Sequence, residues 1–301
     1  MPVAGDLAAA QAFCREVAAR HYENFTVATR LVPARLRQHL ANVYAFARFG
    51  DDIVDEAADP AAAAHGLAAW REELVDCFAG RPRHPVFVAL ADTVRRTDLE
   101  PQPFFDLLDA FEEDRRFDAA GVAVRYADRA AVEAYCRRSA DPVGRIVLAL
   151  EGCRDAERVA MSDAICTGLQ LVNFWQDIRR DRRAGRVYLP RDDMRRHGVT
   201  EAALDAPAAS PALRGLVREE VGWARARFAA GAPLVATAPP VLRPAITLFL
   251  AGGRAVADAI ERAGCDTLVR RPTLPRATKL RLAARAWWAA MTVGWRPGAS
   301  R

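Results

Sequence analysis

Apolar residues recur along most of the chain at the three- and four-residue spacing of an α-helix, and alanine, leucine and arginine dominate these stretches. Runs of alternating β-branched residues bounded by turns, which would predict strands, are scarce. The pattern therefore predicts an all-α fold of about ten helices.

Proline and glycine divide this helical pattern into segments. The predicted breaks lie at residues 32–33, 59–60, 80–82, 101–103, 185–190, 206–211, 239–240 and 271–272. The connections are short, and no long linker or shift in composition separates one part of the chain from another. Residues 1–301 are therefore predicted to form a single domain of antiparallel helices packed around one shared interior.

Four polar residues of the segment 43–56 share one face of a predicted helix. Placed at about 100° per residue, they fall within an arc of roughly 60°. They are Tyr44, Arg48, Asp51 and Asp55. The other sides of this first stripe are apolar and carry Phe46, Phe49, Ile53 and Val54. A helix that is apolar nearly all round is buried, so its carboxylates must be paired, hydrogen-bonded or bound to a metal ion.

A second polar stripe recurs in the segment 169–181, within an arc of roughly 80° by the same projection. Its members are Gln170, Asn173, Asp177 and Asp181. The surrounding positions are again apolar, namely Leu171, Val172, Phe174, Trp175 and Ile178. Oxygen ligands of this kind suit a hard cation, and Mg²⁺ in particular prefers a few carboxylates together with the oxygens of a bound phosphate.

Each stripe taken alone has an equally good ordinary explanation, a solvated helix face with acid–base pairs four residues apart. Two stripes with matching offsets, each embedded in aromatic residues, favour the metal site. A di-iron bundle would need Glu-x-x-His pairs, which the five histidines do not supply. The common glycine-rich nucleotide loops, the zinc-protease motif and the hydrolase nucleophile elbow are also absent from the sequence.

Composition and charge narrow the class of protein further. The chain is 51% hydrophobic and 27% charged, which excludes disordered and collagen-like proteins. Of its 43 basic residues only Lys279 is a lysine, so the formal net charge of +5 rests on guanidinium groups, which suit phosphate-type anions. Acidic residues are interspersed among them, and the excess does not by itself identify a partner.

The six cysteines show no C-x-x-C spacing, which predicts reduced thiols rather than a zinc or disulfide framework. No apolar run is long enough to predict a signal peptide or a membrane-spanning helix. These features predict a cytoplasmic protein.

At the two stripes the sequence resembles the squalene and phytoene synthase family. The segment from Tyr44 to Asp55 is similar to the first D-x-x-x-D motif of that family. The segment from Gln170 to Asp181, followed by residues 185–190, is similar to the second. The resemblance runs through most of the chain. It implies an isoprenoid-synthase helical bundle with a central active-site cavity, and an enzyme that acts on prenyl diphosphates.

Residues 21–25 with 31–33, residues 135–145 and residues 173–176 resemble the hydroxysqualene synthase branch of this family, in bacterial hopanoid biosynthesis. Relatives that carry out the first condensation usually have S-x-S-F and V-A-G-x-V-G segments, whereas this chain has Asn24-Phe25 and Asp141-Pro-Val-Gly144. The resemblance thus implies a carbon–oxygen lyase that ionises presqualene diphosphate with Mg²⁺. The rearranged cation would be captured by water to give hydroxysqualene and diphosphate. It also implies functional coupling to a presqualene diphosphate synthase.

The resemblance assigns roles to individual residues. The implied Mg²⁺ ligands are Asp51, Asp55, Asn173, Asp177 and Asp181. The implied contacts to the substrate are Arg37, Arg48, Gln170 and Arg271. The implied catalytic side chains, whose rings would stabilise a carbocation, are Tyr44, Tyr135 and Tyr188. Ordinary core packing explains Tyr135 and Tyr188 equally well. Ser139 or Asp141 is a candidate for orienting the water, although capping or kinking of a helix before Pro142 explains both at least as well.

Several alternatives stay open from the sequence. The chain could be another head-to-head prenyl synthase, which makes squalene, phytoene or presqualene diphosphate. A different class is a non-enzymatic, arginine-rich helical protein that binds anionic lipid or nucleic acid, supported only by the basic excess. For the enzyme, no nucleic-acid partner is expected. Residues 286–295 could dock peripherally on the inner membrane face, but a helix that caps the core is the favoured interpretation of this tryptophan-rich segment, as core packing is for Trp175.

Overall fold

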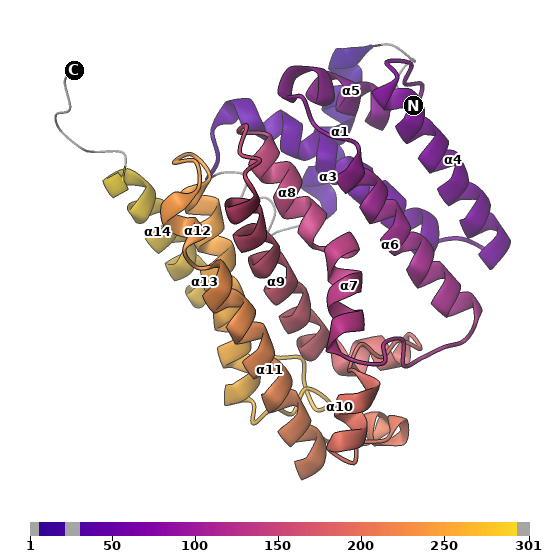
Figure 1. Cartoon of the computed structure of the whole chain (residues 1–301), viewed down its shortest axis with the longest axis vertical. Coiled ribbons are helices and arrows are strands. Elements are labelled where there is room, and N and C mark those ends of the chain that lie inside the picture. Colours follow the sequence, from indigo (N-terminus) through magenta and orange to yellow (C-terminus); the bar gives the residue numbers. More distant parts are fainter. Residues whose placement is uncertain (1–5, 22–30, 294–301) are drawn as a thin grey trace.

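The computed structural model describes residues 6–21 and 31–293, and most of these residues lie in helices (Figure 1). In the described residues no strand forms, and a single isolated β-bridge joins Val124 to Val187. The predicted all-α fold is therefore confirmed. In chain order the helices are α1 (Leu7–His21), α3 (Ala34–Asp55), α4 (Pro60–Phe78), α5 (Pro85–Thr97), α6 (Gln102–Ala119), α7 (Arg129–Ser139), α8 (Asp141–Ala149), α9 (Ala156–Arg183), α10 (Arg191–Arg196), the 3-10 helix η1 (Glu201–Asp205), α11 (Pro211–Gly231), α12 (Leu234–Thr237), α13 (Arg243–Arg262) and α14 (Arg276–Val293).

The predicted breaks coincide with helix boundaries. At the start of α4, for example, the Asp59 carboxylate accepts hydrogen bonds from the backbone amides of Ala61 and Ala62, both at 2.8 Å, and Pro60 is the first helical residue. The structure also interrupts the helical pattern at residues 120–128, at Ala140 and at residues 150–155, where no break was predicted. The break at Ala140 separates α7 from α8 by one residue.

Helix α9 runs through the middle of the molecule and packs against α8, α11 and α13 (Figure 1). The fully buried ring of Phe228 on α11 lies where these helices approach closely. A Cβ atom at Gly168 on α9 would lie 2.8 Å from this ring, and Gly253 on α13 meets the same ring. Because any larger side chain would push the helices apart, these two glycines hold α9 and its polar stripe in place.

Helix α3 is fixed by an aromatic cluster around Phe46. The Phe46 ring lies 5.3 Å from Phe104, 5.8 Å from Phe87 and 6.3 Å from Trp70, measured between ring centroids. These partners come from α6, α5 and α4, so three helices hold α3 one to two turns before Asp51.

The tryptophans separate into two environments. Trp175 is fully buried, as its assignment to the core predicted. The interpretation of residues 286–295 as a core helix is wrong for the described part, because Trp287 is 56% and Trp288 is 68% exposed. Helix α14 packs on α13 through one side only, and Ala286 rather than a tryptophan occupies the buried position. Trp295 lies outside the described residues, as do Asn24 and Phe25.

Two further features bear on the expectations from the sequence. All six cysteines are free, as their spacing predicted. None of the helices in the described ranges combines the length and the apolar character needed to cross a membrane.

Candidate functional site

The first acidic stripe lies at the C-terminal end of α3. Arg48 donates to Asp51 at 3.2 Å and also forms an ion pair with Asp52. Asp55 is the last residue of the helix, is exposed, and accepts a hydrogen bond from Arg186 at 3.1 Å. Burial, and then repulsion from Asp55, raise the pKa of Asp51 to about 6. The stripe therefore presents more negative charge than its arginines neutralise.

The second stripe lies along the C-terminal half of α9. Arg271 donates to both carboxylate oxygens of Asp177, from Nε to Oδ1 and from Nη2 to Oδ2, the latter at 2.9 Å. Asp181, one turn further on, forms no side-chain hydrogen bond or ion pair with any described residue. Burial, and then repulsion from Asp177, raise the pKa of Asp181 to about 7. A half-buried carboxylate without a partner is available to a cation.

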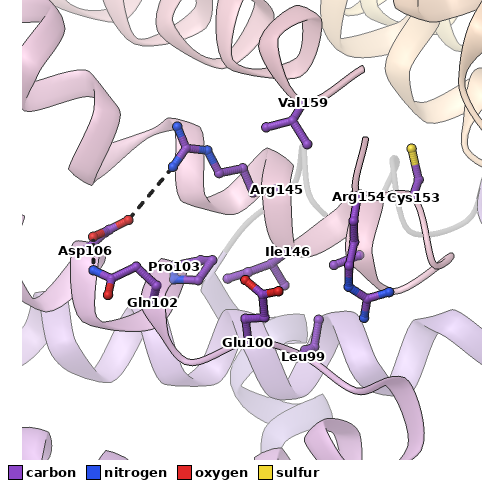
Figure 2. A pocket seen from close by; sticks show the side chains of 11 residues that line it. Leu99, Glu100, Gln102, Pro103, Asp106, Arg145, Ile146, Cys153, Arg154 and Val159 are labelled. Atoms are coloured by element: carbon purple, nitrogen blue, oxygen red, sulfur yellow. Dashed lines mark hydrogen bonds and ion pairs between the residues drawn. The ribbon is translucent and has the colours of Figure 1, made fainter. Parts of the chain in front are cut away.

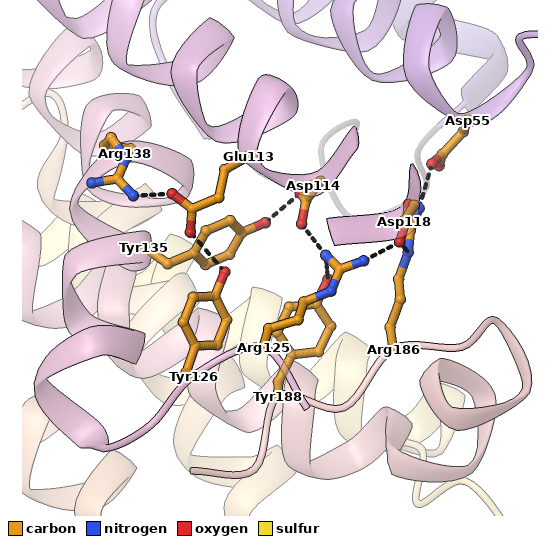
Figure 3. Close-up of polar contacts among 10 residues, drawn as sticks. All are labelled: Asp55, Glu113, Asp114, Asp118, Arg125, Tyr126, Tyr135, Arg138, Arg186 and Tyr188. Atoms are coloured by element: carbon orange, nitrogen blue, oxygen red, sulfur yellow. Dashed lines mark hydrogen bonds and ion pairs between the residues drawn. The ribbon is translucent and has the colours of Figure 1, made fainter. Parts of the chain in front are cut away.

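Arg186 brings the two stripes into one neighbourhood. Helix α9 ends at Arg183, and Gly185 at a φ of 75° lets the chain reverse direction in the left-handed conformation that glycine tolerates. The following residue, Arg186, then reaches Asp55 on α3 and Asp118 on α6, and its charge also acts on Asp181. Asp55 at the end of α3 and Asp118 on α6 therefore bind the same guanidinium (Figure 3), and the electrostatic effect of that guanidinium extends to Asp181 on α9.

A third acidic pair, which the sequence interpretation missed, lies on α6 (Figure 3). Asp114 and Asp118 both bind the guanidinium of Arg125, whose side chain is fully buried. Asp114 also accepts a hydrogen bond from the Tyr135 hydroxyl at 2.7 Å, and Asp118 accepts one from Arg186 at 2.6 Å. The signal was present in the sequence, because this pair has the same four-residue spacing as the two predicted ones and is flanked by phenylalanines.

Two of the three predicted tyrosines pack together beside this cluster. The rings of Tyr135 and Tyr188 lie 6.1 Å apart, and Tyr188 stacks on Phe174 of α9 at 3.9 Å with an interplanar angle of 8°. The Arg125 guanidinium lies 5.5 Å from the Tyr188 ring. Burial, and then the nearby Asp114 carboxylate, raise the pKa of both phenols. Both therefore stay protonated at neutral pH.

The other predicted residues are spread along α3 and α9. Tyr44 is partly buried one turn before Arg48, Gln170 is partly buried and Asn173 is exposed. Arg37 is exposed near the start of α3 and donates to the backbone oxygen of Val32 at 3.3 Å. At 1.5 Å per residue, its backbone lies roughly 20 Å along the helix from that of Asp51. The structure therefore does not bring Arg37 together with the acidic cluster.

The break between α7 and α8 positions the two candidates for orienting a water molecule. Asp141 is buried and accepts a hydrogen bond from the Thr167 hydroxyl of α9 at 2.9 Å. Burial, and then Asp163, raise the pKa of Asp141 to about 7. The Ser139 hydroxyl is buried without a partner among the described residues. Neither side chain caps α8, so the capping explanation does not apply, whereas the break at Ala140 between α7 and α8 agrees with a kink before Pro142.

A separate cavity of about 280 Å³ lies between the start of α6 and α8 (Figure 2). None of the predicted site residues lines it. Its two arginines already have partners: Arg145 pairs with Asp163 at 2.7 Å and with Asp106 at 4.0 Å, and Arg154 donates to the backbone oxygen of Asp98 at 2.7 Å. The acidic neighbourhood around Arg186 is therefore the stronger candidate site.

The donor set of the two predicted stripes fits a hard cation. In the described part of the chain no three His, Cys, Asp or Glu side chains are arranged to hold a metal ion. Each stripe offers a pair of carboxylates, and in each pair one pKa is raised by burial and by the other carboxylate. Two carboxylates suit Mg²⁺, which commonly takes its remaining ligands from water and from substrate phosphates.

Comparisons with known proteins agree with this arrangement. Residues 18–278 match the family model of squalene/phytoene synthase. A phytoene synthase of Arthrospira platensis is 31% identical over 280 residues, which cover 89% of each chain. A presqualene diphosphate synthase of Rhodopseudomonas palustris is 31% identical over 207 residues, which cover 69% of this chain and 72% of the relative.

Two solved structures share the fold. Squalene synthase HpnC from Alicyclobacillus acidocaldarius is 40% identical, with a TM-score of 0.80 and coverage of 88% of this chain and 97% of the other. A dehydrosqualene synthase crystallised with a ligand is 23% identical, with a TM-score of 0.84 and coverage of 95% and 98%. The helical fold is thus that of the isoprenoid synthases, and the chain belongs to the squalene/phytoene synthase family.

Proposed function

We propose that this chain is a hydroxysqualene synthase. It ionises presqualene diphosphate with the help of Mg²⁺, and the rearranged carbocation is captured by water to release hydroxysqualene and diphosphate. The reaction breaks the carbon–oxygen bond to the diphosphate and forms a new carbon–oxygen bond to water. The enzyme therefore acts as a lyase and needs no reductant.

The observation that carries the proposal is the meeting of two incompletely neutralised aspartate pairs on α3 and α9. Asp181 has no partner in the described part of the chain, and Asp51 has a pKa raised to about 6. Such pairs disfavour the metal-free state and favour a bound cation. In a purely structural acidic cluster each carboxylate would have an arginine of its own, whereas here Arg48 is shared by Asp51 and Asp52, and Asp181 has no partner among the described residues.

The Mg²⁺ ligands would be Asp51, Asp55, Asn173, Asp177 and Asp181. When bound, the cation neutralises the negative charge that develops on the departing diphosphate. Arg48 and Arg271 now pair with carboxylates of the two stripes, at 3.2 Å to Asp51 and 2.9 Å to Asp177. The same guanidinium groups are fixed donors for diphosphate oxygens once a cation takes over those carboxylates. Gln170 on α9 and Arg37 are further candidates for substrate contacts.

The tyrosines supply the apolar side of the site. Tyr135 and Tyr188 are protonated and their rings lie tilted against each other, 6.1 Å apart, and their π-faces would stabilise a carbocation without reacting with it. Tyr44, on the face of α3 that carries Asp51, is the third candidate. Asp114 holds the Tyr135 hydroxyl at 2.7 Å and thereby fixes the orientation of that ring.

Two observations support the hydroxysqualene branch. The HpnC squalene synthase is 40% identical, whereas the curated phytoene and presqualene diphosphate synthases are 31% identical. At the break between α7 and α8, Asp141 and Ser139 add polar atoms where condensing relatives have a V-A-G segment. The unpartnered Ser139 hydroxyl is the better placed of the two to orient a water molecule, because Asp141 is engaged by Thr167.

The test is product analysis by mass spectrometry with the purified chain and Mg²⁺, supplying presqualene diphosphate in ¹⁸O-labelled water. We expect an alcohol that carries the label, at a rate indifferent to reduced nicotinamide. Formation of squalene only when reduced nicotinamide is present would refute the assignment to the hydroxysqualene branch. It would not affect membership of the squalene/phytoene synthase family.

Condensation is the second candidate, because the curated relatives at 31% identity are named phytoene synthase and presqualene diphosphate synthase. The discriminating arm supplies farnesyl diphosphate alone. If farnesyl diphosphate is converted to presqualene diphosphate, this chain carries out the condensation. If it is recovered unchanged, the chain acts only on presqualene diphosphate.

A further inference from the structure

The positive charge of the chain is concentrated at its C-terminal end. The last 35 residues, 267–301, contain eight basic residues and no aspartate or glutamate. The 266 residues before them carry a formal net charge of −3, so the overall charge of +5 comes entirely from this stretch. Most of the described part of the stretch is α14, which lies against α13 at the edge of the molecule opposite α4 (Figure 1).

A groove of about 1110 Å³ between α13 and α14 is lined by arginines from both helices and from the segment that joins them. Five of the arginines that line it have no ion pair with a carboxylate in the described part of the chain: Arg254, Arg262, Arg270, Arg281 and Arg285. The two carboxylates of the groove are already engaged, Asp258 with Arg225 at 2.5 Å and Asp266 with Arg214 at 2.8 Å. The groove therefore has a net positive charge that nothing within it neutralises.

Exposed apolar side chains accompany the groove. Leu280 is 71%, Trp287 is 56% and Trp288 is 68% exposed. Leu280 and Trp287 are seven residues apart and so lie on one face of α14, while Arg281 and Arg285 line the groove on another. Val269, in the segment before the helix, is 67% exposed. Together these residues form what we call the α14 surface: Val269, Leu280, Arg281, Arg285, Trp287 and Trp288.

We propose that the α14 surface docks on an anionic phospholipid bilayer. Tryptophan and leucine partition into the boundary between headgroups and acyl chains, and arginine binds headgroup phosphates. A second copy of the chain docked through the same surface would bring the same positive charge against it and be repelled. A nucleic acid would engage the arginines but leave Leu280 and Val269 exposed to water. The bilayer is the partner that satisfies both the charge and the apolar area.

This inference does not depend on the proposed reaction. The described helices include none that can span a membrane, so α14 would lie on the bilayer in the manner of an amphipathic interfacial helix. If the product is a long-chain isoprenoid alcohol, docking would bring the enzyme to the phase in which that product dissolves.

The experiment is flotation of the full chain with vesicles of phosphatidylcholine alone, or with one fifth phosphatidylglycerol, at physiological salt. We expect at least tenfold stronger binding to the anionic vesicles. The R281Q/R285Q variant should lose roughly tenfold to thirtyfold of that binding, since each basic residue contributes about a fivefold factor. Equal binding of the intact chain to both kinds of vesicle would overturn the proposal.

A matched control removes two exposed arginines elsewhere. Arg20 on α1 and Arg116 on α6 are 72% and 73% exposed in surface ion pairs, and R20Q/R116Q lowers the net charge by the same two units. We expect it to float like the intact chain. A loss as large as that of R281Q/R285Q would show that only net charge matters and would contradict a local surface.

The apolar part of the surface has its own test. L280S and W287A each remove an exposed side chain, and each should weaken flotation several-fold with the thermal unfolding midpoint unchanged. Turnover of presqualene diphosphate in vesicle-free solution should also be unchanged, which separates failure of docking from failure of the reaction. Full retention of flotation by both variants, together with equally tight, arginine-dependent binding of duplex DNA, would assign the surface to a nucleic acid instead.

Discussion

Three aspartate pairs in this chain share a spacing of four residues but differ in what surrounds them. In the α6 pair, each of the four carboxylate oxygens accepts a hydrogen bond or ion pair, from Arg125, Tyr135 or Arg186. In the α9 pair, Arg271 holds both oxygens of Asp177, and Asp181 has no side-chain partner among the described residues. The α6 pair is satisfied by the protein itself, whereas the α9 pair is only half satisfied.

The difference shows what distinguishes a structural acidic pair from a ligand site. Spacing alone places two carboxylates on one face of a helix, but the arginines contributed by other elements decide whether they are available. Arg125 comes from the connection between α6 and α7, and the bridge between Val124 and Val187 brings it beside Tyr188. Because that guanidinium is fully buried, it is committed to Asp114 and Asp118.

The largest expected effect is on the satisfied pair. R125M removes the buried cation and leaves Asp114 and Asp118 facing each other in a largely desolvated site. We expect a loss of about 3–5 kcal/mol in the free energy of unfolding, measured by urea denaturation. The R125M/D114N double variant should recover part of this loss, because it removes the carboxylate that loses its ion-pair partner, whereas Asp118 keeps Arg186. A stability for R125M within 1 kcal/mol of the intact chain, about the effect of an exposed pair, would contradict the structural role.

The second prediction concerns the ligand pairs. D51N or D177N should lower turnover on the order of 100-fold, the effect of removing one stabilising group from a charged transition state, without unfolding the chain. Chelation of divalent metal should act similarly, and zinc should not be needed for recovery. The matched control is D109N, which removes an aspartate bound to Arg71 on the exposed side of α6 and should leave turnover unchanged. Unchanged turnover in D51N and D177N would refute the metal assignment.

These contrasts also show how far the sequence could be interpreted. Helical periodicity and the proline and glycine breaks were sufficient for the fold class and for most helix boundaries, because these signals are local. The two stripes were found because four polar residues interrupt apolar helices at regular spacing. Asp114 and Asp118 were missed although they repeat that spacing, because α6 carries many other charges and the pair does not stand out.

Other features could not be predicted because they depend on tertiary contacts. Nothing near Arg125 in the sequence indicates that its guanidinium is fully buried, and nothing near Arg186 indicates that it joins α3 to α6. The exposure of Trp287 was predicted wrongly, since a pair of tryptophans in an apolar helix is more often buried. Only the one-sided packing of α14 on α13 reveals that they face outwards.

The third prediction uses ligand binding to distinguish the α9 pair from the α6 pair. Mg²⁺ and pyrophosphate together should raise thermal stability by more than the sum of their separate effects, because each completes the ligand set of the other. At roughly 30 times the dissociation constant the expected stabilisation is about 2 kcal/mol. D181N should lose most of this shift, whereas D118N should retain it. An equal loss in both variants would mean that the α6 pair belongs to the metal site as well.

The smallest expected effect is in the metal-free protein, where the two pairs should respond in opposite directions to the same chemical change. Asp181 is half-buried, has no partner among the described residues and is repelled by Asp177, so D181N relieves a like-charge contact and should stabilise the chain by about 0.5–1 kcal/mol. Asp118 accepts from both Arg125 and Arg186, so D118N leaves two guanidinium groups with fewer partners and should destabilise the chain by about 1–3 kcal/mol. Thermal unfolding midpoints measured in the presence of a chelator compare the two directly. If D181N destabilises the chain, Asp181 supports the fold. The α9 pair would then be structural like the α6 pair, with fewer partners.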